Sequence, residues 1–129
     1  MLNSNTGVKT TQYGNVTQIL ANVELQASVG GVVPSTSGVE VNGKKIVKAG
    51  TPFAIDLQNR LNPATAGDAN NAFNAVLLHD VDVTSGNNNN GTFLIFGFVD
   101  LTKVETDVQT LIETALTADG HTTLITFLK

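Results

Sequence analysis

Alternating apolar and polar residues dominate the chain from Val16 onward, and this period of two predicts β-strands. The first predicted strand runs from Val16 to Gln26, and a turn-rich break follows from Ser28 to Gly38. Asn42-Gly43 lies between two short apolar runs and predicts a hairpin, because a type I′ turn needs positive φ at both central positions. After this hairpin, a short strand is predicted from Phe53 to Leu57.

The second half of the chain carries its most apolar segments. Residues 58–71 have no sustained period and predict a long surface loop. The segment from Ala72 to Thr84 predicts one strand, and the four asparagines Asn87 to Asn90 predict an exposed hairpin tip. The segment from Thr92 to Val99 is apolar on both faces, which predicts a central strand or one covered by a helix or a partner.

One helix is predicted at about 102–118, where apolar residues recur at spacings of three and four. Thr102 and Glu105 have the spacing of a capping box at its start, and Gly120 suits a C-terminal cap. Residues 121–129 alternate again and predict a last strand. The expected fold is therefore mainly β with one α-helix, a small single-domain antiparallel β-barrel or sandwich-like fold over 16–129, with an extended N-terminal arm over 1–15.

Composition and charge narrow the classes of function. The 129 residues are 41% hydrophobic and only 14% charged, with a formal net charge of −4. Apart from Lys44, Lys45 and Lys48 the basic residues are scattered, which argues against binding nucleic acid through its phosphates. No segment has the roughly 18 apolar residues of a membrane span, and no signal peptide is recognisable at the N-terminus. We expect a protein made in the cytoplasm, with no membrane and no nucleic acid among its partners.

Residues that could carry chemistry are few. Cysteine is absent, and His79 and His121 are the only ordinary candidates for a general base. A structural role is the favoured interpretation of both, with a ligand or catalytic role of His79 as the alternative. On a strand Asp80 and Asp82 project together while His79 points away, so the three cannot share one ion without a bulge. We predict no enzyme activity, no catalytic residue, no cofactor and no metal site.

Two further interpretations of the polar loop between the apolar segments were weighed. Asp82 with Ser85, Asn87 and Asn89 offers oxygen ligands for a weak cation site, but the spacing matches no calcium loop. The run from Gly86 to Gly91 also lacks the lysine and the glycine spacing of a phosphate-binding loop. A solvated turn is the favoured interpretation.

The order of three short motifs resembles the head-decoration and head-fibre proteins of tailed bacteriophages. The first is K-x-G-T-P at Lys48 to Pro52, the second is the segment AVLLHDVDVT that ends at Thr84, and the third is G-x-V-D-L at Gly97 to Leu101. The match covers residues from about Lys44 to Leu116, and the order of the motifs is more specific than any one of them. Ala75 stands where the family often has glycine. Only HTTLITFLK follows the helix, which favours a short decoration protein, or the capsid-binding base of a fibre, over a fibre with a shaft.

The resemblance implies a β-rich homotrimer on the outer surface of an icosahedral capsid, where it cements neighbouring copies of the major capsid protein. Three copies that bind three coat sites at once would gain avidity. The N-terminal arm would contact the capsid, and the dense strand with the helix would supply the trimer contact. The implied capsid contacts are Asn3, Asn5, Val8, Lys9 and Tyr13. The implied trimer contacts are Phe93, Ile95, Phe96, Phe98, Leu111 and Ile112.

The alternative class is a host-surface or carbohydrate-binding module displayed on the virion, for example as the base of a head fibre. Its contacts would come from the loops Ala66 to Asn74 and Ser85 to Asn90. Sugar binding usually uses exposed aromatic rings, and these loops have only Phe73, which favours the capsid-binding hypothesis.

Overall fold

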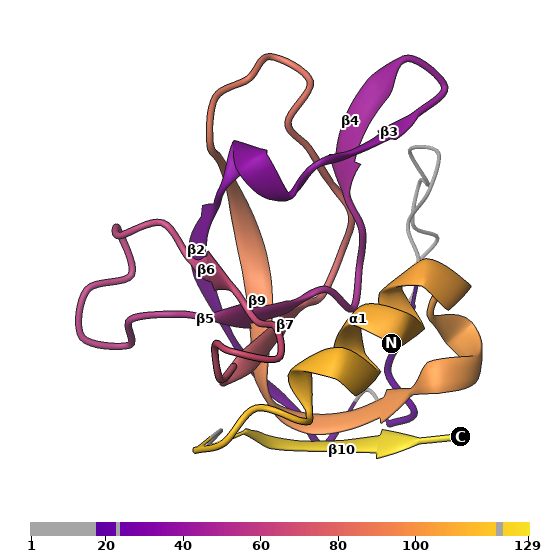
Figure 1. Cartoon of the computed structure of the whole chain (residues 1–129). Helices are drawn as coiled ribbons and strands as arrows, with labels where there is room; N and C mark the ends of the chain where they lie inside the picture. The colour runs from indigo at the N-terminus through magenta and orange to yellow at the C-terminus, as the bar shows by residue number, and fades with distance from the viewer. Residues whose placement is uncertain (1–17, 23, 121–122) are drawn as a thin grey trace, which may run out of the picture.

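The computed structural model describes residues 18–22, 24–120 and 123–129 (Figure 1). Strands dominate these residues, and one α-helix lies between the last two of them. The elements in chain order are β2 (Ala27–Val33), η1 (Ser35–Ser37), β3 (Val39–Val41), β4 (Lys44–Val47), β5 (Pro52–Ala54), β6 (Thr65–Ala66), β7 (Ala75–Leu77), β8 (Val81–Asp82), β9 (Asn89–Asp100), η2 (Leu101–Lys103), α1 (Thr106–Ala115) and β10 (Leu124–Leu128). The prediction of a mainly β fold with one helix is confirmed.

The strands form two sheets. The larger has the order β10-β9-β7-β5-β6, with β2 also paired to β9, and the smaller has the order β3-β4-β8. Neither sheet closes on itself among the described residues, so the sandwich-like form of the prediction fits better than the barrel. All pairs are antiparallel except β9 with β10, which run parallel because α1 connects them.

The long strand β9 organises the larger sheet. Leu94 pairs with Val76 of β7 and with Ser28 of β2, so these two strands lie on opposite sides of β9. Phe96 likewise pairs with Leu124 of β10 and with Ala27 of β2. Strands β7 and β10 therefore lie along the same side of β9, one after the other.

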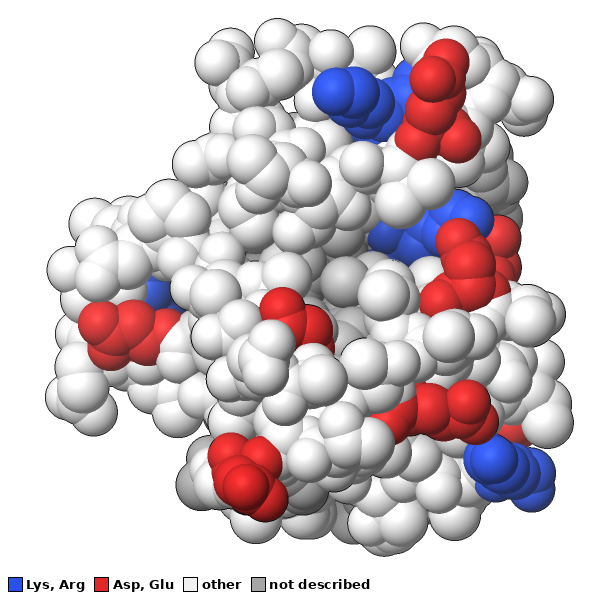
Figure 2. Space-filling model, in the orientation of Figure 1, with Lys and Arg blue, Asp and Glu red and all other residues white. Residues whose placement is uncertain are grey.

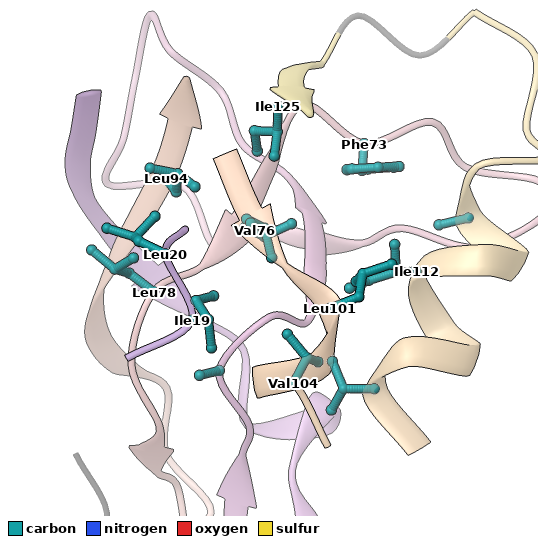
Figure 3. Close-up of a cluster of buried hydrophobic side chains, with 14 residues drawn as sticks. Ile19, Leu20, Phe73, Val76, Leu78, Leu94, Leu101, Val104, Ile112 and Ile125 are labelled. Carbon is teal, nitrogen blue, oxygen red and sulfur yellow. The ribbon is translucent and has the colours of Figure 1, made fainter. Parts of the chain in front are cut away.

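Two hydrophobic clusters lie on opposite faces of this sheet. Side chains of β7 alternate between them: Val76 belongs to the cluster beneath α1, and Ala75 and Leu77 belong to the cluster between the two sheets. The first cluster also contains Val108 and Ile112 of the helix (Figure 3). The centre of the larger sheet is thus covered by the helix on one face and by the smaller sheet on the other.

The hairpin prediction is confirmed. Asn42 has φ 52° and Gly43 has φ 82°, which are the positive values of a type I′ turn, and Val41 pairs with Lys44 on either side of it. The last strand is also confirmed, as β10.

The predicted first strand is wrong. The described residues of this segment, 18–22 and 24–26, contain only an isolated bridge between Leu20 and Val99. The Asn22 side chain accepts hydrogen bonds from the backbone N–H groups of Glu24 and Leu25 and so forms a turn. The strand begins instead at Ala27 and continues through the predicted break. Gly31 permits this, because a Cβ there would lie 2.8 Å from the Phe93 ring.

The predicted strand from Ala72 to Thr84 is two strands in different sheets. The chain breaks between Leu77 and Val81, where the Asp80 carboxylate accepts a hydrogen bond of 2.7 Å from the backbone N–H of Ala49. This bond ties the break in the strand to the turn after β4. His79 is exposed, so its prediction on one face with Leu77 and Val83 is also wrong.

The helix is shorter than predicted. It runs from Thr106 to Ala115, and the predicted capping box does not form, because Thr102 lies in the preceding 3-10 turn and donates to the Asp100 carboxylate. The Gln109 amide instead donates to the carbonyl oxygens of Leu101 and Val104. The helix ends at Ala115, with Leu116 as its C-cap, rather than near Gly120.

Candidate interaction surface

One face of the β9–β10 ribbon has no covering element among the described residues. Gly97 pairs with Ile125, and Val99 pairs with Phe127. Val99, Ile125 and Phe127 pack in or against the cluster beneath α1. The alternate side chains of the ribbon point the other way, away from the helix. Phe96 is 43% exposed, Leu124 69% and Leu128 43%, and Phe98 is half-buried between them. We call Phe96, Phe98, Leu124 and Leu128 the apolar strip.

The strip ends at an edge strand. β10 pairs only with β9 among the described residues, and the backbone N–H of Ile125 donates to the Thr123 hydroxyl. The strand itself contains no proline and no charged residue, although such residues commonly protect exposed edges. The edge of β2 is protected, since Arg60 and Ala64 donate to its carbonyl oxygens at Gly30 and Val32. β10 therefore offers both an apolar face and an open hydrogen-bonding edge to another chain.

The structure separates the six predicted trimer contacts. Phe96 and Phe98 belong to the apolar strip, and Leu111 is exposed on the outer face of α1. Phe93 and Ile112 are 0% exposed, because they pack in the two clusters inside the chain. They cannot contact another subunit without unfolding part of the core, and we remove them from the predicted set.

Ile95 of that set is half-buried and packs against the cluster between the sheets. The predicted capsid contacts Asn3, Asn5, Val8, Lys9 and Tyr13 lie outside the described residues, as do the predicted arm over 1–15 and His121.

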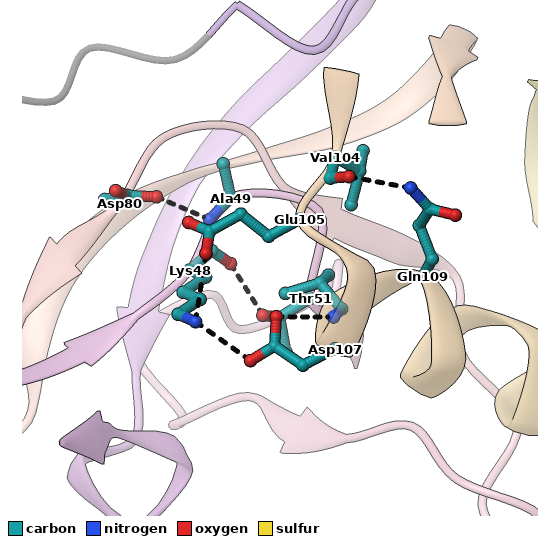
Figure 4. Close-up of polar contacts among 9 residues, drawn as sticks. Lys48, Ala49, Thr51, Asp80, Val104, Glu105, Asp107 and Gln109 are labelled. Atoms are coloured by element: carbon teal, nitrogen blue, oxygen red, sulfur yellow. Dashed lines mark hydrogen bonds and ion pairs between the residues drawn. The ribbon is translucent and has the colours of Figure 1, made fainter. Parts of the chain in front are cut away.

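The motif segments that carry the resemblance lie side by side. The backbone N–H of Gly50 donates to the carbonyl of Leu77, and that of Leu77 donates to the carbonyl of Thr51. The Thr51 hydroxyl donates to the carbonyl of Lys48 within its own turn, and Asp80 holds Ala49 (Figure 4). These polar residues thus fix the join between β4 and β7.

Lys48 extends this join to the helix. Its ammonium lies 2.9 Å from Asp107 and 3.1 Å from Glu105, at the start of α1 (Figure 4). The hydrogen bond to Asp107 raises the pKa of Lys48 above its usual value despite partial desolvation, and the contacts with Glu105 add to the effect. The same hydrogen bond lowers the pKa of Asp107. The ion pairs therefore stabilise the docking of the helix when all three groups are charged.

Lys48→Met is expected to lower the free energy of unfolding by up to about 1 kcal/mol at neutral pH, because both carboxylates are more than half exposed and solvent screens the pairs. Because the pKa of Lys48 is raised, the stabilisation by the ion pairs should be lost at alkaline pH only above about pH 10.4. Because the pKa of Asp107 is lowered, this stabilisation should be lost at acid pH only below about pH 3.9. The difference between wild type and variant should thus be constant from about pH 5 to 9 and shrink outside that window. Urea denaturation across pH measures it, with exposed Lys44→Met as the control. A difference that persists unchanged at pH 3 would contradict the assignment.

The other candidate chemical groups have structural partners. Asp82 accepts from Thr84, whose hydroxyl and backbone N–H lower the pKa of the carboxyl group. Asp80 binds Ala49, away from Asp82. No group of three or more His, Asp or Glu side chains converges within the described part of the chain.

The asparagine run is partly a strand. Asn89 and Asn90 begin β9, so only Asn87 and Asn88 lie in the turn that was predicted for all four. Asn88 accepts a hydrogen bond from the backbone N–H of Ser35, and Asn89 donates to the carbonyl of Asp82. Phe73, the aromatic residue of the alternative sugar-binding loops, is 1% exposed and contacts Phe127, so its ring is not available for stacking.

Charged side chains do not gather into a large patch on the face seen in Figure 2, where basic and acidic groups lie interspersed on a mostly uncharged surface. In the described ranges no helix is long and apolar enough to span a bilayer. The apolar strip therefore stands out from this surface as a row of exposed large apolar side chains beside a strand edge.

In comparisons with known proteins the chain matches no protein-family model and no curated protein sequence.

Proposed function

We propose that this chain is a structural virion protein that binds the outer surface of an icosahedral phage capsid as a trimer and cements or decorates it. The apolar strip is the observation that carries the proposal. An exposed sheet face with Phe96 and Leu124 at its centre, next to an open strand edge, suits contact between subunits. A symmetric trimer would cover three such strips at once.

The motif order supports the choice of capsid decoration over other assemblies. The first two motifs form the join among β4, β7 and α1, where their polar side chains have partners inside the fold. These side chains stabilise the fold, and a decoration protein needs no catalytic chemistry to bind a capsid. The low content of charged residues, at 14%, suits a wetted interface rich in neutral hydrogen-bonding groups.

Light scattering at micromolar concentration tests the subunit number. The expected mass is three times the 13.5 kDa of the chain. A strictly monomeric protein would contradict a trimer that forms before the capsid is bound.

Deletion of Met1 to Tyr13 is expected to reduce the occupancy of the protein on phage particles, because the proposed capsid contacts lie in this segment. Thermal unfolding should change little, since the deleted residues precede the core residues Ile19 and Leu20. Co-sedimentation with phage capsid particles measures occupancy. Replacement of the same segment by a glycine-serine segment of equal length is the control for chain length. Unchanged occupancy of the deleted protein would exclude the arm as the capsid contact.

A further inference from the structure

A surface cavity of about 590 Å³ lies beside the first residues of β9, several residues along that strand from the apolar strip. Strand β2 lines one side from Gly30 to Val32, and the loop after β5 lines the other side from Leu57 to Leu61. Pockets for small ligands and peptide side chains usually have volumes of roughly 300 to 1,000 Å³. The cavity is therefore large enough to accept part of a ligand.

The loop that lines the cavity is held in place by its own hydrogen bonds. The Asp56 carboxylate accepts from the backbone N–H groups of Gln58 and Asn59. Arg60 Nη1 donates to the carbonyl of Gly30 over 2.9 Å, and the backbone N–H of Ala64 donates to the carbonyl of Val32 over the same distance. The loop is thus tied to β2 at Gly30 and at Val32, so the cavity is formed before any ligand arrives.

Glycine at position 30 keeps part of the cavity open, although packing inside the fold does not require a glycine there. A Cβ at Gly31 or Gly91 would lie within 3 Å of core side chains, so those two glycines are required by packing. At Gly30 the added Cβ would meet only Arg60 Nη1, at an ordinary 3.9 Å, and the backbone φ is not positive. Glycine weakens a strand, and an unexplained one often marks a place where a ligand or another backbone approaches closely.

The side chains around the cavity favour an anionic ligand with an aliphatic part. Arg60 is the sole arginine of the sequence, and none of the ion pairs between described residues involves it. Its guanidinium has five N–H donors, and the bond to Gly30 uses one of them. Leu57 and Leu61 are 49% and 84% exposed beside it. No aromatic ring lines the cavity, which disfavours a sugar.

We propose that this cavity binds an extended peptide segment in which an acidic residue is flanked by aliphatic residues. The carboxylate pairs with Arg60, the aliphatic side chains cover Leu57 and Leu61, and the peptide backbone passes over Gly30. The proposal does not depend on the trimer or on the capsid, since every residue that it uses belongs to one chain. It adds a second contact surface, at the other end of β9 from the apolar strip.

A titration of the full-length, ¹⁵N-labelled protein with the peptide acetyl-Leu-Glu-Leu-Leu-amide tests the proposal by NMR. Saturable shifts are expected at the backbone amides of Gly30, Gly31 and Leu61. The matched peptide with Gln in place of Glu should bind at least about fivefold more weakly, because it loses the charge-assisted hydrogen bonds to Arg60. Equal binding of the two peptides, or no saturable shift at millimolar peptide, would overturn the proposal.

Two variants locate the binding. Gly30→Val fills the cavity with a residue that favours strands, and Arg60→Gln removes the charge; each is expected to weaken binding of the Glu peptide by about fivefold or more. Lys44→Gln removes a positive charge from the distant hairpin and should leave binding unchanged. Unchanged binding by Arg60→Gln would show that the carboxylate is not recognised here. The last probe is glucuronic acid. If it causes saturable shifts at the same amides and the peptide does not, the ligand of the cavity is an acidic sugar and the peptide proposal is wrong.

Discussion

Phe96→Asp is expected to separate the proposed trimer into folded monomers. Phe96 lies at the centre of the apolar strip and is 43% exposed in the single chain. Burial of a large apolar side chain contributes roughly 1.5 to 3 kcal/mol, and a symmetric trimer buries three copies. The concentration at which subunits associate should therefore rise by more than about a hundredfold, since an aspartate at a buried interface adds the cost of desolvating its charge.

Sedimentation equilibrium over a range of concentrations measures this change, and circular dichroism checks that the variant is folded. Leu124→Asp should have the same effect, because Leu124 pairs with Phe96 on the same face. Val39→Asp is the matched control, since it places the same charge on an exposed apolar position of the β3–β4 hairpin. An unchanged association constant for both strip variants would mean that subunits meet elsewhere.

Phe93→Ala is expected to lower the free energy of unfolding by about 3 to 5 kcal/mol, the usual cost of a large-to-small change in a core. The Phe93 ring is fully buried and packs edge-on against Phe53, with centroids 5.6 Å apart. It also lies against Gly31, so the cavity left by the ring would loosen the pairing of β2 with β9.

The size of this loss should not depend on protein concentration, because the contacts of Phe93 are within one chain. Urea denaturation at two concentrations tests it, and Phe96→Ala is the matched control, with a loss below about 1 kcal/mol in the monomer. If the loss in the free energy of unfolding caused by Phe93→Ala grows with protein concentration, Phe93 contributes to the contact between subunits.

Local sequence patterns correctly predicted the elements that depend only on residues close together in the chain. Asn42-Gly43 specifies its turn through backbone preferences of two residues, and the apolar run that became β9 needs only its own composition to be recognised. The same holds for β10, whose alternation is short but regular.

Predictions failed where a side chain binds a distant or competing backbone group. Asn22 turns the chain within a well-alternating segment, and Asp80 leaves its predicted strand to hold Ala49. Gly30 and Gly31 suggested a break, yet β2 continues through them because Phe93 on the neighbouring strand needs the space that Gly31 provides. The partners of Asp80 and Gly31 are far away in the sequence, whereas the turn at Asn22 is local but lies within a segment whose alternation favours a strand.

The candidate contact residues show the same division. Phe93 and Phe96 are the same residue type on the same strand, but Phe93 is buried between the sheets and Phe96 is exposed. Ile95 is the extra residue opposite the register shift at Ala27 and Ser28, and this shift brings Phe96 to the same face of the sheet as Phe93. Phe93 lies in the cluster between the two sheets, whereas Phe96 lies outside it. How much of this face the smaller sheet covers is a tertiary property, so sequence alone could not distinguish the two phenylalanines.

The sequence by itself determined the mainly β class, the single helix, the hairpin and the scarcity of catalytic groups, because these follow from composition and from the spacing of neighbouring residues. Only the tertiary structure decided the parallel pairing of β10 with β9, the uncovered face of that ribbon and the cavity beside Gly30. Each of these depends on residues far apart in the chain, since burial and exposure are set by which elements pack together. The apolar strip and the Arg60 cavity are therefore the surfaces from which the experiments start.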